Sequence, residues 1–368
     1  MKLNSKSCIF FILTLVGCSS GFLKYEKAKE IFKNDDFEKK VQIKEVPAAE
    51  QPLLAPPAVS QARETIVPMS NLNQTQAPPA PAVLQKKDVI KIVNKKNKTN
   101  KSLVENKIVE DKLPKAREPS LEDQVGFKEG ERRPIVDPFH VGERVVHAVS
   151  YFAAQAGTLA FSVGPYVEVN GQKSYSFKTE IKSGRLFSNF YSVDDQVETF
   201  VDYLSFVPHV FKLQIKETAQ LKEAQSYFDH EKLKANYWEK KYTEKNGYEE
   251  KKMEWDLLPF SQNAFSAIFY MRVFNWEVGR EYAFRVSDDE KNIIFRAKAI
   301  ERVQLNTDAG KFDAIKAKAE VVSRGALSQT GDLYFWISND EHKYVLRIEA
   351  KIKIGTLVSE VIEITPGK

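Results

Sequence analysis

The chain has 368 residues, and 35 of its 42 aromatic side chains lie in residues 139–368. The formal net charge of +5 is also unevenly distributed along the chain. Residues 86–117 carry eleven Lys or Arg against four Asp or Glu, whereas residues 139–368 carry 31 basic and 32 acidic residues. A large hydrophobic core is therefore expected only in the C-terminal part, and a basic globular domain that binds nucleic acid is disfavoured.

The first 17 residues have the parts of a secretory signal peptide. Lys2 and Lys6 precede nine uncharged, mostly apolar residues, 8–16, and the small residue Gly17 follows. This apolar run is shorter than the roughly 20 residues that a membrane-spanning helix needs. Residues Leu15-Val16-Gly17-Cys18 resemble the lipobox of bacterial lipoproteins, in which the signal peptidase cleaves between Gly17 and Cys18 and the cysteine thiol is acylated.

Cys18 is the predicted lipid attachment site. The alternative is a chance occurrence of these four residues at the end of an ordinary signal peptide. After cleavage Cys18 is the only cysteine, so we expect no disulfide within the chain and no thiol catalysis in the folded domain. Residue 19 is Ser rather than Asp, which by analogy with enterobacterial sorting favours an outer-membrane protein that faces the periplasm. The predicted location is the bacterial cell envelope, with palmitate-like chains as the anchor.

Residues 18–138 have the composition of a disordered linker. Residues 47–82 hold eight prolines, and no aromatic residue lies between Phe37 and Phe127. Such a linker would reach at most ~380 Å, far from the membrane. The basic block 86–117 is interpreted either as a self-repelling, solvated linker or as a contact with an anionic envelope surface.

From Phe139 onward, short apolar runs of alternating polarity are separated by turn residues. This spacing predicts a mainly β domain over 139–368, with a large antiparallel sheet that curls into a half-barrel or β-spiral. The predicted strands are Arg144–Phe152, Thr158–Val163, Val167–Val169, Tyr175–Ile181, Phe187–Val193, Val197–Tyr203, Phe211–Glu217, Ala224–Phe228, Leu233–Tyr242, Tyr248–Leu257, Glu281–Val286, Asn292–Arg302, Phe312–Val322, Leu333–Ser338, Tyr344–Lys353 and Gly355–Ile364.

One helix is predicted within this domain. Apolar residues recur at spacings of three and four in Phe260–Trp276, and Ser261 is the expected N-cap. The Lys- and Glu-rich stretch 216–252 is also compatible with a helix, but its aromatic residues favour strands.

Four short motifs stand out in the predicted domain. They are Val141-Gly142-Glu143-Arg144 with Ala156-Gly157, Asn263-Ala264-Phe265-Ser266 with Tyr270-Met271-Arg272, Thr307-Asp308-Ala309-Gly310-Lys311-Phe312, and Trp336-Ile337-Ser338-Asn339-Asp340 with Gly355. In this order they resemble a bacterial envelope family, the domain of unknown function 3108. The resemblance covers roughly 139–364. It implies an extracytoplasmic β-rich domain, similar to the half-barrel carriers of lipids or lipoproteins, and no established activity. Asn263 departs from the Asp of the family.

The family-like polar residues Ser266, Arg272, Trp336, Ser338 and Asp340 are the candidate contacts. Buried polar groups must be satisfied, so these residues are expected either to pin the helix to the sheet or to contact a ligand.

The histidines do not form a metal-ligand pattern in the sequence. A metal needs ligands that converge within about 2 Å of one ion, and His140 and His147, seven apart on one strand, would face opposite ways. His209, His230 and His342 fall in turns. We interpret the histidines as solvated turn residues and expect no metal, no cofactor and no catalytic residues.

The acidic clusters Asp194-Asp195, Asp288-Asp289-Glu290 and Asp340-Glu341 lie between predicted strands. We interpret them as turn formers, with paired carboxylates for a cation or for glycoside hydrolysis as the alternative.

The sequence thus predicts a lipid-anchored, non-enzymatic binding domain for a lipid, a glycan or an envelope protein. The alternative is a structural or assembly factor of the cell envelope that acts through protein contacts. An enzyme that acts on an envelope polymer is the third hypothesis.

Overall fold

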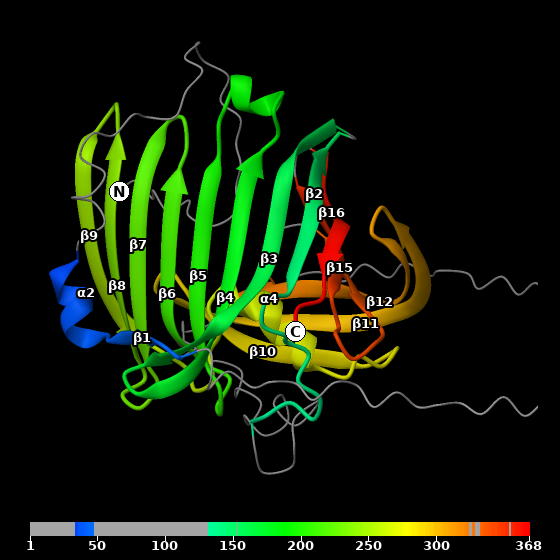
Figure 1. Ribbon diagram of the computed structural model, residues 1–368, viewed down its shortest axis with the longest axis horizontal. Coiled ribbons are helices and arrows are strands. Elements are labelled where there is room, and N and C mark those ends of the chain that lie inside the picture. Colours follow the sequence, from blue (N-terminus) through cyan, green and yellow to red (C-terminus); the bar gives the residue numbers. More distant parts are fainter. Residues whose placement is uncertain (1–33, 48–131, 153, 324–325, 328–331, 353–354) are drawn as a thin grey trace, which may run out of the picture. The chain divides into compact units, whose positions relative to one another are not determined.

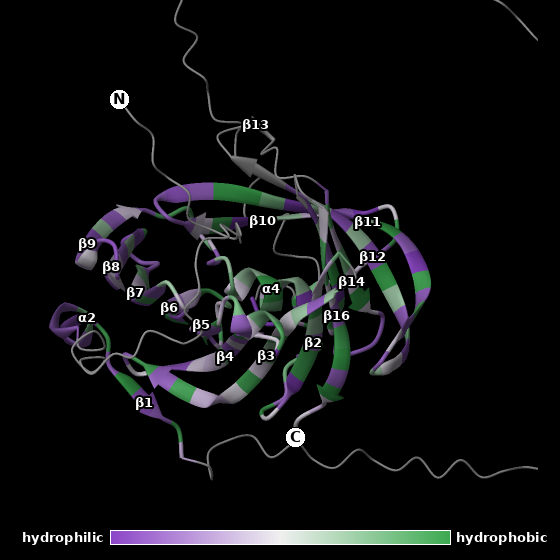
Figure 2. Ribbon diagram, turned by 90° about the horizontal axis from the view of Figure 1, so that it is seen from above, coloured by the Kyte–Doolittle hydropathy of each residue, from purple (hydrophilic) through white to green (hydrophobic). Residues whose placement is uncertain are grey.

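The computed structural model describes residues 34–47, 132–152, 154–323, 326–327, 332–352 and 355–368. These residues form one antiparallel sheet of 16 strands that curls around a short helical segment (Figures 1 and 2). None of their helices is long and apolar enough to cross a bilayer. The predicted fold class, mainly β with a curled antiparallel sheet and a packed helix, is confirmed.

Fourteen strands follow one another across the sheet in the order β10-β11-β12-β14-β15-β16-β2-β3-β4-β5-β6-β7-β8-β9, while β1 pairs with β3 and β13 with β12. Their bounds are β1 Ile43–Glu45, β2 Arg144–Tyr151, β3 Ala154–Val169, β4 Gln172–Ser183, β5 Asp194–Asp202, β6 Pro208–Lys216, β7 Gln220–Asp229, β8 Lys234–Thr243, β9 Gly247–Asp256, β10 Glu281–Asp288, β11 Lys291–Thr307, β12 Gly310–Ser323, β13 Ala326–Leu327, β14 Leu333–Ser338, β15 Val345–Ile352 and β16 Gly355–Thr365.

Most predicted strands are present, because alternating polarity suits a sheet with one buried face. The Lys- and Glu-rich stretch 216–252 forms β7, β8 and part of β9, as its aromatic residues indicated. The strand predicted over Phe187–Val193 is wrong. Phe187–Asn189 is a 3₁₀ turn, in which Ser188 Oγ donates to the Arg185 carbonyl (2.9 Å) and Phe190 is exposed.

The helix is shorter than predicted. Helix α4 spans Ser266–Tyr270 and continues as the 3₁₀ turn Met271–Val273. The residues before it are not helical, because Gln262 forms a parallel bridge to Val286 of β10 between two turns, 259–260 and 264–265. Ser261 is not the N-cap: its hydroxyl donates to the Leu258 carbonyl (2.8 Å).

The helical segment fills the concave side of the sheet (Figure 2). Its Phe269, Tyr270 and Phe274 are at most 2% exposed and belong to one core cluster with side chains of β3, β4, β10, β12 and β14. Phe269 stacks on Phe177 of β4 at 4.2 Å between ring centroids, and Tyr270 contacts Phe284 of β10 at 5.1 Å. The described residues therefore pack the inside of the curl with their own aromatic side chains.

An N-terminal segment also belongs to the domain, which corrects the prediction of an uninterrupted linker over 18–138. Helix α2 (Asp35–Lys40) and strand β1 lie against the sheet, and β1 pairs with β3 through Ile43 and Val169. Residues 132–138 are packed too, since Arg133 Nη1 donates to the Tyr175 hydroxyl (2.7 Å). Both elements are short and charged, so nothing in the sequence indicated that they pack against the sheet. The basic block 86–117 and residues 1–33 lie outside the described residues.

Candidate functional site

The N-cap of α4 is built from Asn263 and Ser266. Asn263 Oδ1 accepts hydrogen bonds from the backbone N–H groups of Phe265 (3.0 Å) and Ser266 (2.8 Å), and Ser266 Oγ accepts from the Asn263 N–H (2.9 Å). Asn263 Nδ2 also donates to Thr199 Oγ1 of β5 (2.8 Å). These bonds satisfy orphan N–H groups of the helix and pin it to the sheet, so Ser266 is placed in the scaffold.

Arg272 lies at the other end of the helical segment and forms a buried ion pair with Glu143. Its Nη1 and Nη2 donate to the two carboxylate oxygens at 2.5 and 2.9 Å, and both residues are at most 3% exposed. Nη2 also donates to the carbonyls of Pro138 (2.9 Å) and His342 (2.8 Å). Arg272 therefore ties three segments together: the helical segment, the chain that leads into β2, and the loop between β14 and β15.

Ser338 and Asp340 shape that β14–β15 loop. Asp340 Oδ1 accepts from Ser338 Oγ (2.7 Å) and from the backbone N–H groups of His342 (3.1 Å) and Lys343 (3.0 Å), while Ser338 Oγ accepts from the Tyr344 N–H (2.8 Å). This is the behaviour of an Asx turn. Its consequence is to direct the His342 carbonyl toward Arg272.

Trp336 is not part of this group. It is 7% exposed and packs in a separate core cluster with Val145 and Leu346, with Lys316 and Arg347 over its ring at 5.2 and 5.3 Å. Of the five candidate residues, the structure therefore brings together Arg272, Ser338 and Asp340, and separates Ser266 and Trp336 from them.

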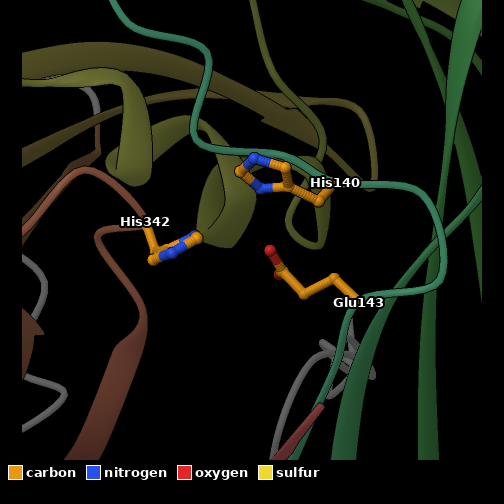
Figure 3. Close-up of side chains that lie close together, drawn as sticks. All are labelled: His140, Glu143 and His342. Carbon is orange, nitrogen blue, oxygen red and sulfur yellow. The ribbon is translucent and has the colours of Figure 1, made fainter. Parts of the chain in front are cut away.

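His140, Glu143 and His342 form a cluster that the sequence analysis missed (Figure 3). One ligand atom of each lies within 4.8 Å of the others, and the two imidazole rings are 5.0 Å apart. Figure 3 shows the Glu143 carboxylate directed between the two rings. One feature of the sequence pointed to this cluster. His140 lies three residues before Glu143 and His342 lies two residues after Asp340, and both acidic residues belong to the family-like motifs.

The interpretation of the histidines as solvated turn residues is wrong for His147 and His209, which lie in β2 and β6, whereas His230 lies in the β7–β8 turn as predicted but is not solvated. His147 is fully buried in β2, where Ser359 Oγ lies 3.1 Å from Nδ1, and burial lowers its pKa to about 4. His230 contacts the Pro208 carbonyl through Nε2 (2.9 Å), and burial likewise lowers its pKa to about 4.

The turn interpretation of Asp194-Asp195 is also wrong, because both residues begin β5. Asp195 is 8% exposed, and burial followed by the charge of Glu217 raises its pKa to about 7. Glu217 accepts hydrogen bonds from Tyr191 Oη (2.7 Å) and Gln220 Nε2 (2.6 Å). The Glu217 carboxylate near Asp195 is thus held by hydrogen bonds from neighbouring side chains.

A groove of about 440 Å³ lies outside the curl, between α2, β8 and β9. Phe37 of α2 anchors one wall, with its ring edge-on to Trp238 of β8 at 5.9 Å. Asn34 caps α2 and donates to Gln225 of β7 (3.0 Å), and Lys252 of β9 pairs with Asp36. The lining includes Lys39, Lys40, Asn236, Trp238, Lys252 and Met253.

Comparisons with known proteins identify the domain but no activity. No curated protein matches the chain. Three solved structures are similar to this chain, and each match covers 62% of it. A β-barrel-like DUF1849 protein of Brucella abortus matches over 98% of its own length, with 8% sequence identity and a TM-score of 0.40. An exported protein with a YmcC-like fold of Bacteroides fragilis matches over 98% of its length (10% identity, TM-score 0.29), and a protein described as a lipoprotein of Parabacteroides distasonis matches over 99% of its length (11% identity, TM-score 0.29). Residues 146–362 match the model of a family of unknown function, and the chain therefore belongs to the family DUF3108.

Proposed function

We propose that the chain is a lipid-anchored, non-enzymatic binding protein of the bacterial cell envelope that holds a glycan in the groove between α2, β8 and β9. The observation that carries this proposal is the packing of the concave side by the helical segment. A ligand cannot enter there without displacing Phe269, Tyr270 and Phe274, whereas the open groove beside α2 is accessible from outside the curl.

The lining of the groove favours a polar, anionic ligand. Lys39, Lys40 and Lys252 outnumber Asp36 and Glu254. Lys40 Nζ donates to the Asn236 amide oxygen (2.5 Å) and lies 5.7 Å from the centroid of the Trp238 ring. These two largely buried side chains thus hold one of the lysines at the groove, where an anionic sugar chain would meet it. A lipid tail would need an enclosed apolar site, so the lipid-carrier version of the sequence prediction is the less favoured one.

If Cys18 carries the anchor, α2 and this groove follow it closely in the sequence. Only residues 19–33 separate Cys18 from Asn34, and fifteen residues span at most ~50 Å when fully extended. A lipid on Cys18, after cleavage behind Gly17, would thus hold the groove close to the outer membrane, on its periplasmic side, and not at the end of a linker of more than a hundred residues. The segment that follows the anchor would also form one wall of the binding site.

Binding of soluble peptidoglycan fragments, whose stem peptides carry free carboxylates, tests the proposal. The full chain with Cys18→Ser is titrated by native mass spectrometry and compared with the Lys252→Glu and Lys245→Glu variants. Lys252 lines the groove, whereas Lys245 lies seven residues away in the β8–β9 turn, about 20 Å along the strand. We expect weaker binding for Lys252→Glu only. An equal loss in both variants, or no binding to the wild-type chain, contradicts the proposal.

A second candidate is the structural or assembly role, and one observation favours it. Strand β9 pairs with β8 on one side, and among the described residues no strand pairs with its other side. An envelope protein could add a strand at this edge. Charged residues cover β9, among them Glu249, Glu250, Lys251 and Lys252, and such charges oppose unselective pairing. A proline in β9, Glu250→Pro, would abolish a partner's binding in this case and leave fragment binding in the groove intact.

A further inference from the structure

The cluster of His140, Glu143 and His342 has unused ligand capacity. The Nδ1 atoms of both histidines are buried and have no hydrogen-bond partner within the described part of the chain. Buried polar atoms are rarely left unpaired, and such an atom calls for an explanation. A neutral imidazole nitrogen is also the commonest protein ligand of transition metals. The imidazoles of His140 and His342 lie on either side of one buried carboxylate here.

The Glu143 carboxylate has lone pairs left over after its two hydrogen bonds from Arg272. These two hydrogen bonds occupy one lone-pair site on each oxygen, and an ionised carboxylate has about four. Ligating carboxylates in metal centres are commonly hydrogen-bonded by a second residue, which fixes their orientation. Arg272 is suited to that role, because it is itself held by the Pro138 and His342 carbonyls.

The donor set selects the class of metal. Two imidazole nitrogens and one carboxylate oxygen suit zinc, whereas calcium and magnesium take oxygen ligands. The charge of Arg272 balances that of Glu143, so the site offers a divalent ion little net negative charge and must bind it through the nitrogen donors. Tyr344 stacks on His342 at 5.0 Å between ring centroids, and its buried hydroxyl is also without a partner among the described residues. A zinc ion needs a fourth ligand, which a water molecule would supply.

We propose that His140, Glu143 and His342 bind one zinc ion, which fastens the segment that leads into β2 to the β14–β15 loop. The two histidines are 202 positions apart in the sequence, and the ion joins the loops that Arg272 already brings together. Lys368 N–H donates to the Val141 carbonyl (3.0 Å), so Lys368 is bonded to the segment between His140 and Glu143.

The test is the titration of Zn²⁺ into the EDTA-treated full chain, carrying Cys8→Ser and Cys18→Ser to remove thiol ligands and no polyhistidine tag. The variants are His140→Ala and His342→Ala, with His209→Ala as the matched control. His209 lies 6.2 Å from His230 between ring centroids, but within the described residues this second histidine pair belongs to no three-residue ligand group, and His230 Nε2 already contacts the Pro208 carbonyl. Binding is measured by calorimetry, folding by circular dichroism, and ligand geometry by the visible absorption of bound Co²⁺.

We expect one Zn²⁺ per chain in the wild type and in His209→Ala, and an affinity lower by about tenfold or more in His140→Ala and His342→Ala. Zn²⁺ should also raise the melting temperature of the wild type and not that of these two variants. Glu143→Gln is less suitable, because it leaves the Arg272 charge buried without its partner. An absence of Zn²⁺ binding, or an affinity that both histidine variants leave unchanged, would overturn the proposal.

Discussion

Arg272 shows how one residue fixes the arrangement of distant segments. It is 3% exposed, and the guanidinium satisfies Glu143 and two backbone carbonyls, from Pro138 and His342. A planar group with five donors suits such a junction better than an ammonium does. The sequence indicated Arg272 as a candidate because of the family-like motif, but its partner Glu143 lies 129 positions away and was not paired with it.

Replacement of Arg272 by Met is expected to destabilise the fold strongly. It leaves the Glu143 carboxylate buried without a counter-charge, a change that typically costs about 3–5 kcal/mol. The double variant Arg272→Met with Glu143→Gln should recover part of this loss. Urea unfolding of the full chain measures the free energies, with Arg302→Met, on the exposed Arg302–Asp313 pair, as the control. An Arg272→Met variant as stable as Arg302→Met would show that the buried pair is not a structural junction.

Asp195 gives the fold a dependence on pH. Its pKa is raised from 3.8 to about 7 by burial and by Glu217, so the folded state holds this proton more tightly than the unfolded state. The stabilising contribution is therefore complete below about pH 4 and is lost as the pH rises to about 7. The Asp195→Asn variant should be more stable than the wild type at pH 8, by about 2–4 kcal/mol, and similar to it near pH 4.

Urea unfolding between pH 4 and pH 8 checks this expectation for Asp195. Asp308→Asn, in the exposed β11–β12 turn, is the control. Parallel pH profiles for the wild type and Asp195→Asn would contradict the assignment of the raised pKa to this carboxyl.

At the scale of elements, β1 pairs with β3 and α2 packs against the sheet, although both are far from the rest of the domain in sequence. Phe37 is 4% exposed and Val41 6%, and both pack against β3, β5, β6 and β8. A six-residue helix has little stability of its own, so this burial holds it in place. The sequence predicted the long strands because each shows its own alternation, whereas α2 has a single buried aromatic residue and no periodic pattern.

Replacement of Phe37 by Ala is expected to release this segment from the sheet. The substitution removes a buried aromatic ring, which typically costs about 3–5 kcal/mol. Proteolytic cleavage within residues 34–47 should become faster, as measured by mass spectrometry of the fragments. Phe190→Ala is the matched control, since Phe190 is 76% exposed. Equal cleavage rates in both variants would contradict the packing role of Phe37.

At the scale of the whole domain, the two ends of the strand order approach each other without pairing. Trp255 Nε1 of β9 donates to Ser287 Oγ of β10, and Asn292 Nδ2 of β11 donates to the Asp256 carbonyl, each at 2.8 Å. Side-chain hydrogen bonds thus link the two ends of the curl where β9 ends, at Trp255 and Asp256. The sequence predicted the curled sheet and the packed helix, because alternation and helical spacing are local properties. It did not predict the His140–His342 contact, because that contact depends on the closure of the β14–β15 loop onto the start of β2.

The central claim is that the ligand lies outside the curl. Hydrogen–deuterium exchange of the full chain with Cys18→Ser, with and without soluble peptidoglycan fragments, tests it most directly. We expect the fragments to slow exchange in α2, β8 and β9, around Lys40, Trp238 and Lys252, and to leave the helical segment Ser266–Val273 unchanged. Slower exchange confined to the helical segment and to β3 and β4, with α2 unaffected, would place the ligand inside the curl and contradict the account.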